Sequence, residues 1–246
     1  MKFLDSFLKD TPLPLPLRHG ETYQDRERID RLLNSHWNDK RAWLRGSDEE
    51  DKHFTYGEVT NLGARQLIEL FNLDGEDIRD KEENQRNGDI VFFDLGSGQG
   101  KLVVQMILEN VATTSVGIEL STLRHSLALQ KWQALQQNSL FHHGGQVDPN
   151  RIQFVNKNIL EADFSKATHI FLSSLCFPEK TIDEIAEVIA RNRRQYKKLQ
   201  TVIALSKLKS LEDENNGAYW KRSFAFIQMT WGMNTAIVYE NCGDCI

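Results

Sequence analysis

The sequence predicts an α/β fold: a mainly parallel sheet flanked by helices and closed by a β-hairpin, behind a helical N-terminal extension. From residue 90 onward, short apolar runs alternate with longer amphipathic segments, which is typical of a parallel sheet with helices on both faces. Two strand-like segments then follow each other across a short turn, Trp231 to Asn234, which indicates a hairpin at the sheet edge.

Length and composition agree with this fold class. The chain has 246 residues, of which 40% are hydrophobic and 26% charged, so a single α/β domain with an extension fits. A net charge of −5 gives no general reason to expect nucleic-acid binding, although a local basic patch stays open. No apolar run approaches the ~20 residues that a bilayer span requires, and the first residues do not resemble a secretory signal.

The N-terminal part is predicted to form an extension of the core. Pro12, Pro14 and Pro16 predict an extended arm, because each proline blocks a helix. Apolar residues at helical spacing predict helices within Glu21–Arg45 and Asn61–Asn72, followed by a polar connector. The predicted divisions are residues 1–73 for the arm and helical extension, 74–89 for the connector and 90–246 for the core.

The core elements follow from the apolar pattern. The predicted strands are Ile90–Phe93, Ser115–Ile118, Arg151–Val155, His169–Leu172, Thr201–Leu205, Phe224–Thr230 and Thr235–Tyr239. The predicted helices between them are Lys101–Asn110, Ser121–Gln137 and Glu179–Lys198.

A glycine-rich loop connects the first core strand to its helix. It reads Asp-Leu-Gly-Ser-Gly-Gln-Gly-Lys from Asp94 to Lys101. Its glycines let the backbone approach a ligand, to which the helix N-terminus offers unpaired N–H groups. The spacing is G-x-G-x-G, whereas dinucleotide-binding folds usually have G-x-G-x-x-G. The loop therefore resembles the S-adenosylmethionine (SAM) loop of the seven-stranded class I, Rossmann-like methyltransferases, with Gly96, Ser97, Gly98 and Gly100 as cofactor contacts.

Three polar positions at strand ends fit that cofactor. Glu119 ends the second strand, where a carboxylate can accept hydrogen bonds from both ribose hydroxyls; the alternative is a solvated strand-end charge. Asp94 lies in an apolar context, and because a buried carboxylate needs partners we assign it to the loop and to the cofactor's ammonium end. Asn158 and Ile159 follow the third strand and suit the adenine, although asparagine is also a common turn residue.

The segment Ser173–Pro178 follows the fourth strand, where the methyl acceptor meets the cofactor in this architecture. It lacks the Asn/Asp-Pro-Pro-Tyr/Phe motif of enzymes that methylate adenine or glutamine, which weakens the case for a nucleobase acceptor. Ser173 and its neighbour could instead cap the next helix. That helix ends in five cations within Arg191–Lys198, which suit the helix dipole or, alternatively, form a docking patch for an acidic partner or nucleic acid.

Several motifs, in order along the chain, resemble one family of methyltransferases. They are Tyr56-Gly57-Glu58, the glycine loop, Gln105, Gly117-Ile118-Glu119, Ile170-Phe171-Leu172 and Thr230-Trp231-Gly232. Together they resemble the disruptor-of-telomeric-silencing family, the non-SET histone lysine methyltransferases. The resemblance covers roughly residues 54 to 239.

The resemblance implies a role for each matching residue. Tyr56, Gly57 and Glu58 would fold over the cofactor, with Tyr56 also near the reacting groups. Ser173 stands where the family has an asparagine beside the methyl group and the incoming lysine, and it would contact the cofactor too. The remaining implied contacts are Asp94, Gly96 and Lys101 to the methionine part, Glu119 to the ribose, Asn158 and Ile159 to the adenine, and Phe177 and Trp231 in an apolar acceptor channel.

These observations predict a SAM-dependent N-methyltransferase that acts on a protein lysine, with a nucleosomal histone as one candidate acceptor. A small-molecule methyltransferase on the same fold and a catalytically silent SAM-binding scaffold are the alternatives. Three cysteines suggest a reducing compartment, so we expect an intracellular protein, cytoplasmic or, with a histone acceptor, nuclear. Cys242 and Cys245 form a C-x-x-C pair, but zinc would need two more ligands, and we expect no metal site.

Overall fold

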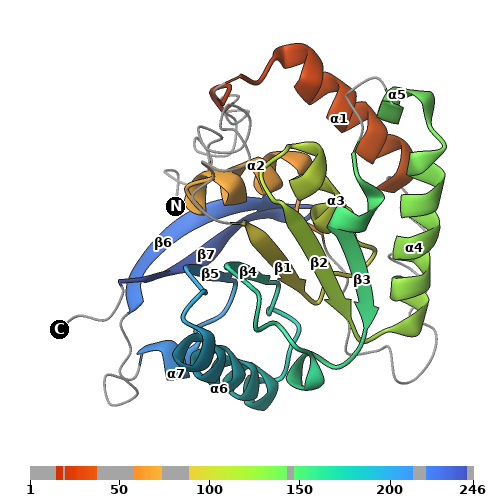
Figure 1. The fold of residues 1–246 in the computed structure, drawn as a ribbon. Coiled ribbons are helices and arrows are strands. Elements are labelled where there is room, and N and C mark those ends of the chain that lie inside the picture. Colours follow the sequence, from red (N-terminus) through yellow and green to blue (C-terminus); the bar gives the residue numbers. More distant parts are fainter. Residues whose placement is uncertain are drawn as a thin grey trace, which may run out of the picture.

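A seven-stranded mixed sheet forms the centre of the computed structural model, which describes residues 15–18, 20–37, 58–73, 89–142, 147–212 and 220–242 (Figure 1). The strand order is β3-β2-β1-β4-β5-β7-β6, with the first five strands parallel and β7 antiparallel to both neighbours. The strands are β1 Val91–Leu95, β2 Thr114–Glu119, β3 Ile152–Asn156, β4 His169–Leu172, β5 Thr201–Ala204, β6 Trp220–Met229 and β7 Gly232–Asn241. The predicted fold class is confirmed.

The strand order reverses beside β1, which pairs with β2 on one side and with β4 on the other. In an open parallel sheet, the loops that leave the two central strands in opposite directions open a crevice at their carboxyl ends. The segments after β1 and β4, which the sequence identified as glycine loop and acceptor loop, therefore meet at one edge of the sheet.

Five helices pack on one face of the sheet, the upper face in Figure 1. They are α1 Tyr23–Trp37, α2 Asn61–Leu70, α3 Lys101–Leu108, α4 Thr122–Gln136 and α5 Ser139–His142. Residues of all five share one hydrophobic cluster, whose fully buried members include Leu32, Leu67 and Met106. The helices of the N-terminal extension thus belong to the same core as the helix that follows the glycine loop.

The opposite face is covered by α6 Glu179–Tyr196 and α7 Lys209–Glu212, with the short 3-10 helix η5 Ile159–Glu161 beside them (Figure 1). The apolar face expected for α6 is buried there, with Ile185 and Ile189 inaccessible to solvent. The helices α5 and α7 were not predicted, because four residues are too few to show a helical period.

A buried ion network fixes the extension to the core. Glu109, at the end of α3, accepts from Arg65 Nε at 2.9 Å and also from Arg18 of the N-terminal arm. Arg65 in turn contacts Asp30 of α1 at 2.8 Å. Breaking one partner of such a network leaves a buried charge uncompensated, which costs about 3–5 kcal/mol.

Several predicted features lie outside the described residues: most of the arm, the second part of Glu21–Arg45, the connector 74–89 apart from Asp89, and Tyr56 with Gly57. The domain boundaries therefore stay predictions. Among the helices of the described part, none is long and apolar enough to cross a membrane.

Candidate active site

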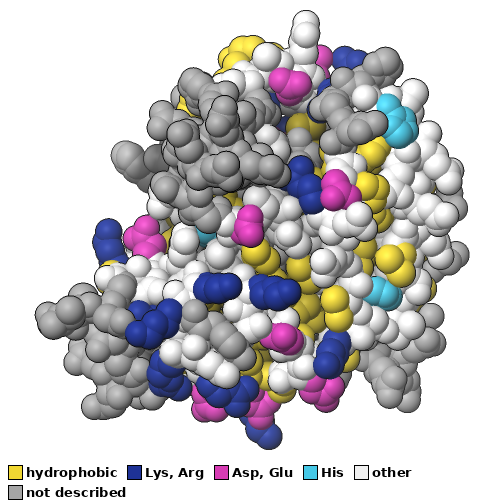
Figure 2. Space-filling model, viewed as in Figure 1, with side chains coloured by type: hydrophobic (Ala, Val, Ile, Leu, Met, Phe, Trp, Pro, Cys, Tyr) yellow, Lys and Arg dark blue, Asp and Glu magenta, His cyan; other side chains and the backbone are white. Residues whose placement is uncertain are grey.

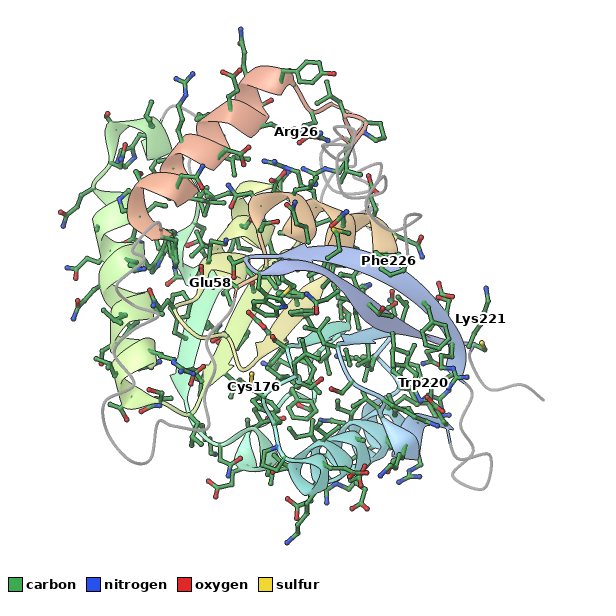
Figure 3. All side chains as sticks on the ribbon, turned by 180° about the vertical axis from the view of Figure 1, so that it is seen from behind. Arg26, Glu58, Cys176, Trp220, Lys221 and Phe226 are labelled. Atoms are coloured by element: carbon green, nitrogen blue, oxygen red, sulfur yellow. The ribbon has the colours of Figure 1, made fainter. Side chains whose placement is uncertain are left out.

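A cavity of about 500 Å³ opens at the carboxyl ends of β1, β2 and β4. Most of the predicted site residues line it: Glu58, Asp94, Gly96, Ser97, Gly98, Lys101, Glu119, Asn158, Ile159, Ser173, Phe177 and Trp231. The structure brings these residues together from separate parts of the chain. Leu102 of α3 and Thr181 of α6 line it too, so the cavity wall draws on both helical layers. Figure 3 shows Cys176 on the side of α6.

The glycine loop is held by the end of the neighbouring strand. The amides of Gly96 and Ser97 both donate to the carbonyl of Ile118 in β2, at 2.9 and 3.0 Å. The Gly98 amide donates to Glu119 Oε2 at 2.8 Å. These bonds fold the loop against β2, so the loop and the carboxylate of Glu119 form one rigid unit.

Gly100 lies behind this unit and does not line the cavity. Its φ of +79° is in the left-handed region, and a Cβ there would lie 2.4 Å from the Phe154 ring and 3.1 Å from Ala128. Both the backbone conformation and the close approach of Phe154 require glycine. We predicted a cofactor contact, whereas the structure gives Gly100 the role of ending the loop and capping α3.

Glu119 is oriented by backbone donors. Its Oε2 accepts from Gly98 and its Oε1 from the Ser121 amide at 2.9 Å, and the residue is 7% exposed. A carboxylate has about four lone-pair sites. Each oxygen can therefore still accept a hydrogen bond from a ribose hydroxyl, so the geometry is compatible with the predicted role. Because Glu119 is buried, the alternative of a strand-end charge in solvent is wrong.

Three ionisable side chains, Glu58, Asp94 and Lys101, line the part of the cavity where the glycine loop begins and ends. Lys101 Nζ lies 3.8 Å from Glu58 Oε2, and burial lowers the pKa of Lys101 while Glu58 opposes this effect. Asp94 is 4% exposed. Burial, reinforced by the negative charges of Glu119 and Glu58, raises the pKa of the Asp94 carboxyl to about 8. This part of the cavity therefore favours a ligand that brings positive charge.

Asn158 and Ile159 begin η5 beneath the cavity. Asn158 is the N-cap, and its side-chain oxygen accepts from the Leu160 amide at 3.0 Å. The turn interpretation is thus correct for this asparagine. An amide oxygen has a second lone pair and the amide nitrogen two donors, so the cap does not exclude a contact to an adenine edge.

The acceptor loop after β4 covers the glycine loop. A Cβ on Gly96 would lie 3.1 Å from Phe177 Cζ, so the Phe177 ring packs directly over Gly96. Ser173 lines the cavity at the end of β4. The alternative that the serines cap the next helix is wrong, because Pro178 occupies the N-cap of α6 without a side-chain cap bond.

The hairpin and the extension meet beside this loop. Val59 forms an antiparallel bridge with Met229. Thr230 donates its amide to the Glu58 carbonyl at 2.9 Å, and its hydroxyl accepts from the Glu58 amide at 3.2 Å. Backbone pairing thereby places Glu58 near Trp231, which follows Thr230 directly.

Leu175, Cys176 and Pro178 of the predicted acceptor segment also line the cavity, and the sequence analysis assigned no individual role to the remaining lining residues, which are Val59, Leu102, Leu120, Arg124, Leu160, Phe171, Thr181, Glu184 and Ile185. Two signals could have found some of them. Leu120 directly follows Glu119, and Thr181, Glu184 and Ile185 share one face of the predicted helix at i, i+3 and i+4 spacing.

The basic end of α6 is separate from the cavity. Arg193 is buried and bonds Asn241 at 2.8 Å, whereas Arg191, Arg194, Lys197 and Lys198 are exposed. Figure 2 shows Lys and Arg side chains over the region of α6 and α7, with Asp and Glu side chains among them. The acidic-partner interpretation of this end stays a prediction. No cluster of metal-ligand type occurs among the described residues.

The strand order, the glycine loop after β1 and the carboxylate at the end of β2 define the class: a class I methyltransferase fold with a cavity at its switch point. The chain belongs to the family described as Histone methylation protein DOT1, whose model matches residues 52–228. This methylation family and this fold together assign SAM as the cofactor.

Solved methyltransferase structures are similar to this chain at low sequence identity. Magnesium protoporphyrin IX methyltransferase from Synechocystis PCC 6803, with bound SAM, is 12% identical over 87% of this chain and 97% of that chain, with a TM-score of 0.50. An RNA methyltransferase from Salinibacter ruber is 18% identical over 72% and 89%, with a TM-score of 0.45. TrmK from M. capricolum is 16% identical over 71% and 68%, with a TM-score of 0.44. The comparison with curated proteins found no match.

Proposed function

We propose that the protein is a SAM-dependent N-methyltransferase that acts on a lysine side chain of a protein, with a nucleosomal histone as the first candidate acceptor. Membership of the histone methylation family supports this acceptor class. So does the cavity mouth: Leu175 and Trp231 line the cavity and yet are 47% and 49% exposed. A side chain that belongs to a large protein must enter from outside, and an open apolar mouth suits this better than a closed metabolite pocket.

The charges of the cavity suit cationic reactants. Four carboxyl side chains line it, Glu58, Asp94, Glu119 and Glu184, against the two cations Lys101 and Arg124. SAM supplies a methyl group on a positively charged sulfur. Glu58, Glu119 and Glu184, together with Asp94 once it ionises, would offset the charge of the cofactor and attract a protonated lysine to the mouth.

The chain's own residues would then align and desolvate the amine. An exposed lysine has a pKa of about 10.4, and an apolar wall favours the neutral form that reacts. Phe177 and Trp231 would supply this wall, while the Ser173 hydroxyl would accept a hydrogen bond from the amine. SAM would supply the methyl group to the amine nitrogen and leave as the neutral thioether S-adenosylhomocysteine, and the proton lost by the amine would go to water. Alignment and exclusion of water account for most of the acceleration.

The test is transfer of a radiolabelled methyl group from SAM, with recombinant nucleosomes, free core histones and a fractionated cell lysate offered as acceptors. Label on a protein lysine is the expected result, and label on nucleosomal histone would identify the first candidate. Label restricted to the small-molecule fraction would refute the protein acceptor, and label restricted to RNA would refute it equally. SAM binding without label anywhere would favour a silent scaffold.

A pair of glutamate variants controls the transfer assay. Glu119→Ala should abolish transfer, because it removes the carboxylate placed beside the glycine loop. Glu187→Ala, an exposed glutamate of α6 that does not line the cavity, should transfer like the wild type.

A further inference from the structure

Gln99, between the second and third glycines of the loop, is held by two groups from outside the loop. Trp37, the last residue of α1, donates its indole Nε1–H to the Gln99 backbone carbonyl at 2.8 Å. Lys131 of α4 donates its Nζ to Gln99 Oε1, and this ammonium lies 5.7 Å from the centroid of the Trp37 ring. We call Trp37, Gln99 and Lys131 the Gln99 clamp.

The contact between Trp37 and Gln99 is shielded from water, while Lys131 is half-buried. Trp37 is 7% exposed and Gln99 is 3% exposed. In such surroundings a hydrogen bond is stronger than in water, so losing it costs more free energy than at the surface. The indole N–H is therefore a firm constraint on the Gln99 carbonyl.

This constraint acts on the cofactor loop through the planarity of the peptide bond. The Gln99 carbonyl and the Gly100 N–H belong to one rigid plane. The same N–H donates to the Ser97 carbonyl at 2.9 Å, and Lys101, the next residue, begins α3. Orienting the Gln99 carbonyl thus orients the peptide that closes the glycine turn and starts the helix.

The Gln99 clamp and Glu119 hold the loop at adjacent residues. The amide of Gly98, on the other side of Gln99, donates to Glu119 Oε2. Helix α1 is a stable anchor for Trp37, since its Leu32 and Leu33 are fully buried and its Asp30 pairs with Arg65 of α2. Helix α1 thereby reaches the cofactor loop without lining the cavity.

We propose that Trp37 is a positioning residue for SAM: through the Gln99 clamp, the N-terminal helix fixes the glycine loop in the conformation that binds the cofactor. This inference rests on the proposed function for its ligand. It assigns helix α1 to the cofactor site, so the extension contributes to binding as well as to stability.

The decisive variant is Trp37→Phe, which retains an aromatic ring in the core but removes the indole donor together with part of the ring volume. The matched control is Trp132→Phe, which makes the same change at another tryptophan that is 7% exposed, belongs to the same core and packs its ring on Phe141. Each variant is assayed by calorimetry with S-adenosylhomocysteine (SAH), by thermal melting and by hydrogen exchange of the free protein at residues 96–101. Lys131→Met, which keeps the aliphatic stem, tests the second contact.

For Trp37→Phe we expect about a tenfold loss of SAH affinity, the effect of losing one buried hydrogen bond to the loop, and faster exchange at Gly98 and Gly100. Trp132→Phe should lower the melting temperature but leave affinity and loop exchange unchanged, and Lys131→Met should follow Trp37→Phe with a smaller effect. Wild-type affinity and exchange in Trp37→Phe would overturn the inference, as would equal losses in both tryptophan variants. If the wild type binds no SAH, the proposed function fails, and exchange at residues 96–101 still decides whether Trp37 orders the loop.

Discussion

The buried carboxyl of Asp94 should couple cofactor binding to pH. Burial and the like charges of Glu119 and Glu58 raise its pKa to about 8, so at neutral pH most of the free protein holds this carboxyl protonated. The ammonium end of the cofactor, which we assign to Asp94, favours the ionised form. Binding should therefore release a proton, and affinity should increase with pH.

The size of the effect follows from the fraction of ionised protein. With a pKa of about 8, that fraction is about 1 in 100 at pH 6, about 1 in 10 at pH 7 and about one half at pH 8. A ligand that requires the ionised form loses affinity in proportion to this fraction. We expect SAH affinity to rise about tenfold from pH 6 to pH 7 and to level off above about pH 9.

Calorimetry with SAH across this pH range, in buffers of different protonation enthalpy, measures both the affinity and the proton released. The ligand's own amine also titrates, but it contributes equally to the wild type and to Asp94→Asn. The ratio of wild-type to Asp94→Asn affinity should therefore increase with pH. A ratio that is constant or falls, or proton uptake by the wild type at pH 7, would show that Asp94 is not the ionising group.

Further predictions concern stability, binding and the acceptor. The pKa of Asp94 rises from 3.8 in the unfolded chain to about 8 in the folded protein, so between these two pH values only the folded state keeps the proton. The stability of the folded state should therefore fall as pH rises from about 4 to about 8. Thermal melts of Asp94→Asn should lack this pH dependence of the melting temperature. Gly100→Ala should destabilise by about 2–4 kcal/mol in chemical denaturation, because it combines a positive φ with a clash against Phe154, and a loss below about 1 kcal/mol would contradict this. Glu119→Ala should remove SAH binding by calorimetry; unchanged affinity would refute its ribose role. Trp231→Ala should raise the KM for a protein acceptor at constant SAH affinity, and an equal loss of SAH affinity would place Trp231 in the cofactor site instead.

The parallel core was predictable because its sequence signals are local. Each strand is a short apolar run, and His169–Leu172 has the bounds that the sequence predicted. The hairpin strands were predicted too short. Strand β6 begins at Trp220, whereas its start was predicted at Phe224, because the intervening Lys221, Arg222 and Ser223 are polar, exposed residues that continue no apolar run. Figure 3 shows Phe226 on this edge strand of the sheet.

Site residues were predictable where a carboxylate stands at or near the carboxyl end of a predicted strand. Glu119 and Asp94 each follow this rule, and both line the cavity. Contacts between segments that are far apart in the sequence were not predictable, because no local pattern of residues indicates them. The pairing of Glu58 with Thr230 and the hydrogen bond from Trp37 to Gln99 join residues far apart in the chain. Only the folded structure shows that helix α1 reaches the glycine loop.

The acceptor of the methyl group is the central question, and mass spectrometry of the product tests it most directly. The wild type would be incubated with SAM and recombinant nucleosomes, and the histones digested and searched for methylated side chains, with Glu119→Ala as the inactive control. The proposed function predicts added methyl groups on the ε-amine of specific lysines, and none with Glu119→Ala. Formation of SAH with every nucleosomal lysine unmodified would contradict a nucleosomal acceptor, and a methylated small molecule as the sole product of the lysate assay would contradict a protein acceptor altogether.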